Sequence, residues 1–215
     1  MSGQPSQVFL LSPAYCGGRR AVSLLRPDAS HALAKRLRAG ILTLGEAFSF
    51  CSGLYFRGKL AYAGVFARAS QAGQPATFVI TPTRGLLVPE TPVSLEVLQE
   101  FASVDIGAVD PRYRVPLERD AAALAATLSP TGRVVLLGSI ATGKYADVLA
   151  PAFGGRLHYP SSFVGRGDMS RGGLLLRSAS SLTELEYQVL EQGAVRRGPR
   201  PPRLEALPDR HAGRP

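Results

Sequence analysis

Residues 133–137, Arg-Val-Val-Leu-Leu, run directly into residues 138–144, Gly-Ser-Ile-Ala-Thr-Gly-Lys. The run of branched apolar residues predicts a buried central strand. The glycine-rich segment behind it predicts a loop, and residues 145–150 predict a helix. A strand that passes through a short loop into a helix is the repeating unit of α/β proteins, so this stretch sets the expected fold class.

Similar units extend outward in both directions. Residues 7–11 and 76–80 are short apolar runs, each closed by a hydroxyl residue and a proline, and both are predicted strands. Residues 156–159 are predicted as another strand, and the alternation of residues 184–190 favours a last one. Helices are predicted over residues 29–38, 43–50, 54–69, 94–101 and 116–128, the last beginning at a proline.

The remaining segments are predicted loops. Residues 83–92 are irregular, residues 161–173 are dense in glycine and charge, and residues 173–177 fit either a strand or a buried helix. Because strands alternate with helices, the sequence predicts an α/β fold. We expect a single domain over residues 1–191, with a central mixed or mostly parallel sheet flanked by helices.

The composition limits the class of protein and of partner. Of 215 residues, 45% are hydrophobic and 19% charged, which suits one domain with a substantial core. The net charge of +9 indicates an anionic partner such as nucleic acid or a nucleotide. Residues 192–215 hold six arginines against two acidic residues, so we expect a basic, flexible Pro/Arg-rich tail there; the alternative is a nucleic-acid-binding arm.

Several classes are excluded or disfavoured. Cys16 and Cys51 lack zinc-site spacing and are too few for a disulfide scaffold. No apolar run approaches the roughly 20 residues needed to span a bilayer, and no targeting pattern opens the chain. We therefore expect a cytoplasmic protein with no membrane partner, no metal and no cofactor. The sequence leaves the oligomeric state open.

The loop at residues 138–144 has the Gly-x4-Gly-Lys spacing of a phosphate-binding loop. Tyr145 follows where such loops carry a Ser or Thr for Mg²⁺, which argues against an NTPase. Two readings stay open. One is an anion-binding corner formed by Ser139, Thr142, Gly143 and Lys144; the other is a structural turn.

Other candidate binding residues lie in loops beside predicted strands and helices. Tyr55, Arg57 and Lys59 interleave an aromatic ring with cations, as in base stacking combined with phosphate contact, although they also fit a core anchor beside a solvated face. Arg84 follows a predicted strand end, where open α/β sheets place ligands. Four further candidates belong to glycine-rich loops or strand ends: Ser12, Arg19, Arg166 and Arg171.

Catalytic groups are few. No Ser–His–acid or Cys–His arrangement is supported, so chemistry would depend on a single carboxylate acting as general base. The candidates are Asp168 and Asp147, with Glu46 and Glu90 as weaker ones. For Asp168 the alternative is a helix-capping role.

Short motifs resemble the YaaA-like peroxide-stress proteins. They are Leu-Ser-Pro-Ala at residues 11–14, Ser-Gly-Leu-Tyr at 52–55 and Arg-Gly-x-Met-Ser-Arg at 166–171. Residues 78–89 resemble a related uncharacterised domain found fused to tRNA- or DNA-guanine transglycosylases. The resemblance implies an α/β fold with a basic cleft, DNA binding and a role in protection against oxidative or DNA damage. It carries over no catalytic residue, and Cys16 to Arg19 stand where the family places a lysine.

The sequence therefore favours a nucleic-acid-binding protein, DNA rather than RNA, that could process a base or nucleotide. The first alternative is an N-glycosidic hydrolase or transferase in which Asp168 or Asp147 stabilises an oxocarbenium-like centre. The second is a small-nucleotide binder that uses residues 138–144.

Overall fold

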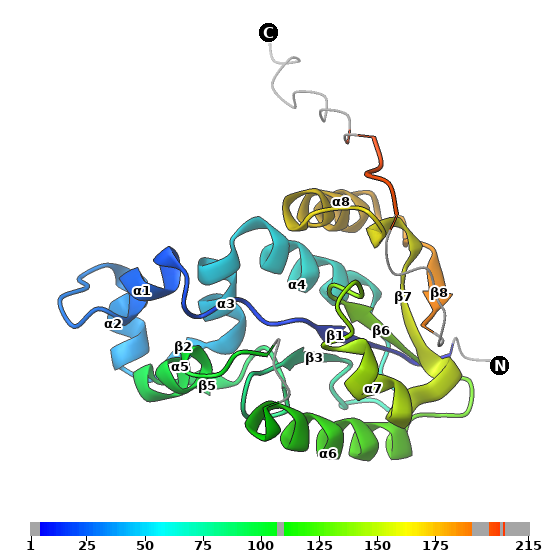
Figure 1. Ribbon diagram of the computed structural model, residues 1–215, viewed down its shortest axis with the longest axis horizontal. Coiled ribbons are helices and arrows are strands. Elements are labelled where there is room, and N and C mark those ends of the chain that lie inside the picture. The colour runs from blue at the N-terminus through cyan, green and yellow to red at the C-terminus, as the bar shows by residue number, and fades with distance from the viewer. Residues whose placement is uncertain (1–4, 107–109, 191–197, 203, 205–215) are drawn as a thin grey trace, which may run out of the picture.

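A six-stranded sheet forms the centre of the computed structural model, which describes residues 5–106, 110–190, 198–202 and 204 (Figure 1). The inner strands are parallel and both edge strands are antiparallel to their neighbours. In spatial order the strands are β4 (Leu86–Leu87), β3 (Thr77–Ile80), β1 (Gln7–Leu11), β6 (Arg133–Leu137), β7 (Leu157–Pro160) and β8 (Tyr187–Val189). The predicted α/β domain with a mixed, mostly parallel sheet is confirmed.

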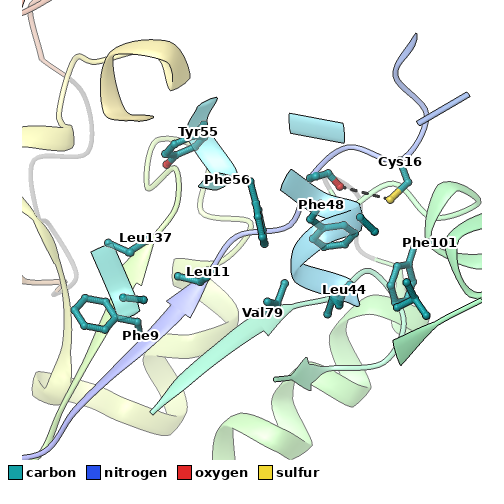
Figure 2. Close-up of a cluster of buried hydrophobic side chains, with 14 of the residues drawn as sticks. Phe9, Leu11, Cys16, Leu44, Phe48, Tyr55, Phe56, Val79, Phe101 and Leu137 are labelled. Carbon is teal, nitrogen blue, oxygen red and sulfur yellow. Dashed lines mark hydrogen bonds between the residues drawn. The ribbon is translucent and has the colours of Figure 1, made fainter. Parts of the chain in front are cut away.

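Alternation along β1 divides the core into two layers. Phe9 and Leu11 face one cluster of buried side chains, and Val8 and Leu10 face the other. The first cluster joins the strands to α3 (Leu44–Ser52) and α4 (Leu54–Phe66), where Phe48 and Phe56 meet edge to face (Figure 2). Since both faces of β1 are covered, every one of its residues is buried.

Helices cover both faces of the sheet (Figure 1). The second layer contains α6 (Pro111–Thr127) and α7 (Ala146–Phe153). The remaining helices accompany the first layer, together with a short ribbon of β2 (Leu42–Thr43) and β5 (Pro92–Val93). They are α1 (Arg19–Leu25), α2 (Ala32–Arg38), α5 (Leu95–Ala102) and α8 (Asp168–Ser181).

Local signals explain where several helices begin. Thr43 and Glu46 form a reciprocal capping box at the start of α3, and Ser94 accepts the Val97 N–H at the start of α5. The predicted start of α6 at Pro116 was wrong. The helix begins at Pro111, because Asp110 accepts the Arg112 N–H, and Pro116 lies inside it.

The predicted loop over residues 161–173 was also wrong in its second half. α8 begins at Asp168, so residues 173–177 are helical, and α1 occupies a segment for which no helix was predicted. Glycine is useful in α8 because it lies against α4: a Cβ on Gly172 would meet the Tyr55 Cα at 2.8 Å, and one on Gly58 would meet the Gly172 carbonyl oxygen at 2.7 Å. The pair permits an approach that larger residues would prevent.

Most of the predicted tail lies outside the described residues. Two contacts join the described part of the tail to the domain. The Pro202 carbonyl accepts a hydrogen bond from Arg166, and a Cβ on Gly173 would lie 3.5 Å from the Leu204 side chain. Within the described ranges, no helix is both long enough and apolar enough to cross a membrane.

We expect Gly172→Ala to lower the free energy of unfolding by about 1–3 kcal/mol, because the new methyl group would overlap backbone atoms of α4. Gly64→Ala is the matched control, since Gly64 lies on the exposed side of α4 with open space at its Cβ position. There, alanine should stabilise the helix by up to about 1 kcal/mol. Urea unfolding of both variants measures the difference, and equal effects would contradict the close helix contact.

Candidate functional site

A cleft of about 690 Å³ opens at the carboxyl ends of β1, β3 and β6. In the sheet, β3 lies on one side of β1, whereas β6 and then β7 lie on its other side. The strand order thus reverses between β1 and β6, and open α/β sheets place ligands at such a switch point. The cleft occupies the position where this topology favours binding.

The segments that follow three of the strands, together with the start of α8, form part of the cleft wall. Ser12 follows β1, Pro82 follows β3, Ser139 and Lys144 follow β6, and Asp168 opens α8. Ser12 is fixed by its N–H, which donates to the Leu137 carbonyl at 3.1 Å. A Cβ on Gly138 would lie 3.0 Å from the Ser12 Cβ, so the loop after β6 can pass close to Ser12.

Lys59 lies directly behind this wall, with 1% of its surface exposed. Its Nζ donates to the Ser12 carbonyl at 2.5 Å and lies 2.9 Å from the Ser12 Oγ. The rings of Tyr55 and Phe56 enclose the same nitrogen, at 4.3 and 4.8 Å from their centroids. Lys59 makes no ion pair with any carboxylate in the described part of the chain.

This environment makes Lys59 an unusually weak base for a lysine. Burial lowers the pKa of Lys59 to about 7, the charge of Asp168 opposes that change, and Arg171 and Lys144 add to it. The predicted role of Lys59 as a direct phosphate contact conflicts with its burial. At neutral pH a substantial fraction of Lys59 is an uncharged amine.

Two tyrosines form the polar wall next to Lys59. Tyr55 lines the cleft, but its buried hydroxyl has no partner at hydrogen-bonding geometry among the described residues. Tyr145 also lines the cleft, and the Lys144 Nζ lies 5.1 Å from its ring centroid. Burial raises the pKa of both hydroxyls, so both remain protonated and able to donate.

Asp168 enters the cleft from the start of α8, with 70% of its side chain exposed. Arg171 forms an ion pair with it at 3.5 Å, and Arg171 donates to the Phe163 carbonyl. Arg171 is buried and stacks over the Phe163 ring, so it holds the loop before α8 rather than facing the cleft. The cap position before α8 belongs to Gly167, and Asp168 is the first residue of the helix.

A basic rim, defined as Arg19, Arg20 and Arg57, lies beside the cleft. These exposed side chains line shallow hollows together with Met169, and Cys51 and Ser52 belong both to one of these hollows and to the cleft. None of the three guanidinium groups pairs with a carboxylate among the described residues. The rim therefore presents uncompensated positive charge at one side of the opening.

Other predicted site residues lie elsewhere. Arg84 pairs with Glu100 at 2.7 Å, and Arg166 donates to the Ser162 carbonyl and to Ser170. Thr142 and Asp147 are exposed and do not line the cleft. Gly143 adopts a left-handed backbone conformation with φ +71°. Of the four residues of the predicted anion corner, Ser139 and Lys144 line the cleft.

Sequence reasoning missed several lining residues. Asp105 and Phe101 come from the end of α5 and the segment after it, which carry no motif. Cys16 and Cys51 also line the cleft, but burial raises the pKa of their thiols to about 12 and about 11. Thiols held protonated in this way are poor nucleophiles. No group of three or more His, Cys, Asp or Glu side chains suited to a metal occurs within the described ranges.

No protein-family model, curated protein or solved structure matches this chain.

We expect Lys59 to impose a pH dependence on stability. Its folded pKa lies below its unfolded value of about 10.5, so between pH 7 and 10 the unfolded chain binds the extra proton. The free energy of unfolding should then rise with pH, by up to about 1 kcal/mol per pH unit. Because the cysteines act in the opposite direction above pH 9, the useful window is pH 7 to 9.

Lys59→Met should remove this rise, because methionine fills similar space without a titrating group. The measurement is the wild-type minus Lys59→Met difference in unfolding free energy at several pH values. Lys35→Met, at an exposed position on α2, serves as the control and should leave the rise intact. A difference that is flat across pH 7 to 9 would mean that Lys59 keeps an ordinary pKa.

Proposed function

We propose that the protein binds nucleic acid, with one nucleotide unit in the cleft and the neighbouring phosphates on the basic rim. The observation that carries the proposal is the position of three arginines, Arg19, Arg20 and Arg57, beside a cleft at the sheet's switch point. None of them pairs with a carboxylate in the part of the chain that the structure describes. Several other surface arginines are paired with carboxylates, as Arg112 with Asp110 and Arg114 with Glu118. Unpaired guanidinium groups are the ones that gain most from a phosphate.

The cleft has features that suit a base and its sugar phosphate. Tyr15 lines its mouth with 78% of its surface exposed, which is unusual for a large ring and suits stacking on a base. Lys144 and Ser139 supply a cation and a hydroxyl at the loop after β6. An aromatic platform beside phosphate-binding cations is the recurrent arrangement in proteins that bind single strands.

DNA as the nucleic acid, a role in protection against oxidative or DNA damage, and a cytoplasmic location remain proposals. The stress role derives from the resemblance of residues 11–14, 52–55 and 166–171 to the YaaA-like proteins. A free nucleotide is the simpler ligand for the same cleft. It is less favoured, because a cleft made for a single nucleotide has no need of an adjoining rim of three arginines.

Replacing Arg19, Arg20 and Arg57 together by alanine should weaken DNA binding and reduce its salt dependence. Each phosphate contact contributes about 0.7–0.9 to the slope of log affinity against log salt, so loss of three contacts should reduce the slope by about 2–3. Fluorescence anisotropy with short single-stranded and duplex oligonucleotides, across a salt series, measures this slope.

The matched control removes three arginines from the opposite layer, Arg112, Arg114 and Arg119, all on α6. It changes the net charge by the same amount but should leave the slope close to that of the wild-type protein. Equal losses in both triple variants would indicate a response to net charge alone. Absence of DNA binding by the wild-type protein would refute the proposal.

Cleavage of an N-glycosidic bond is the second candidate function. Asp168 favours it, because this residue enters the cleft, forms an ion pair with Arg171 and places a carboxylate where an oxocarbenium-like centre could be stabilised. Asp147, the other carboxylate considered, lies outside the cleft wall.

Asp168→Asn should then lower base release from DNA containing damaged or modified bases by at least about 100-fold, with DNA affinity retained. Chromatographic detection of the released base measures the activity, and Asp147→Asn is the control. Release that is unchanged in Asp168→Asn would remove this carboxylate from the chemistry.

A further inference from the structure

We infer that Ser12 and Lys59 form a nucleophile–base pair, and that the cleft hydrolyses acyl esters through an acyl-enzyme on the Ser12 Oγ. This activity goes beyond the proposed binding function and does not depend on it. The Oγ of Ser12, a residue of the cleft wall, lies 2.9 Å from the Lys59 Nζ buried behind it.

The hydrogen-bond geometry places the Lys59 nitrogen against both oxygens of Ser12. Lys59 donates one N–H to the Ser12 carbonyl and lies within donating distance of the Ser12 Oγ. Once Lys59 has lost a proton, its lone pair can accept the Ser12 hydroxyl proton over the same 2.9 Å. A neutral lysine beside a serine is an established way to activate a hydroxyl nucleophile without histidine.

The charged groups around Lys59 determine how readily it loses its proton. Asp168 and Arg171 from α8 act in opposite directions, Lys144 from the loop after β6 disfavours the ammonium, and burial on α4 has the largest effect. Together they bring the pKa of Lys59 near neutrality, which is the range in which a general base is most effective.

The other nucleophile candidates are weaker, because the Cys16 and Cys51 thiols are held protonated. Phosphoryl transfer is less favoured, since Lys144 is the one cation among the cleft-lining residues described.

The reaction balances with water as its co-substrate. Lys59 takes the proton from Ser12 as the Oγ bonds to the ester carbonyl carbon, and the carbonyl electron pair moves onto oxygen. Collapse of this intermediate breaks the carbon–oxygen bond to the alcohol, which leaves with the proton from Lys59. Water then attacks the acyl carbon, with Lys59 again accepting the proton and returning it to Ser12 as the acid departs.

The test uses p-nitrophenyl acetate and p-nitrophenyl butyrate with the full chain. We expect a rapid release of about one p-nitrophenolate per chain, followed by slower turnover. Peptide mass spectrometry after acid quench should place the acyl group on Ser12. The acylation rate should rise with pH through about 7, where Lys59 loses its proton.

Ser12→Ala should abolish the rapid phase, and Lys59→Met should slow it by at least about 100-fold. Ser181→Ala and Lys35→Met, at the end of α8 and on the exposed side of α2, are the matched controls and should behave like the wild-type protein. Adducts on other residues, a rapid phase that survives Ser12→Ala, or an unchanged rate in folded Lys59→Met would each overturn the inference. If Lys59→Met does not fold, the adduct position and the wild-type pH profile decide the question.

Discussion

The contact between α4 and α8 at Gly58 and Gly172 is the constraint on which the site depends. A Cβ on either residue would overlap backbone of the facing helix, so only glycine permits this separation. The approach places Tyr55 and Lys59 of α4 beneath the start of α8, where Asp168 and Arg171 lie. Packing between two helices thus determines both the burial of an amine and the position of the charges that act on it.

The central sheet could be predicted from the sequence because its signals are local. Residues 7–11 and 133–137 are apolar runs bounded by turn-forming residues, and every residue of β1 is buried. The errors came from residues whose usual preference is overridden by their surroundings. Pro116 continues a helix that Asp110 has already capped, and Gly172 lies inside α8 because α4 passes close to it.

Part of the site could also be predicted from local signals in the sequence. Ser12, Ser139 and Lys144 follow strand ends, and parallel strands bring their carboxyl ends to one edge of the sheet. Contacts between residues far apart in the sequence could not be predicted. Arg84 follows a strand, but its guanidinium pairs with Glu100. Lys59 lies near Tyr55 and Phe56 in the sequence, and the fold packs both rings around its amine. The residue types can be read from the sequence, but their charge and exposure depend on contacts that only the folded chain makes.

The short antiparallel strands at the two margins of the sheet have a consequence for the behaviour of the protein at high concentration. β4 comprises two residues and β8 three, and each covers one side of the parallel strands. Long, flat margins expose rows of unpaired backbone groups that recruit strands from other molecules. Here the outermost strands are too brief to offer such a template, and they occupy the outer edge of β3 at Val79 and Ile80 and of β7 at His158 to Pro160. Intermolecular β-pairing is thereby restricted at both ends of the sheet.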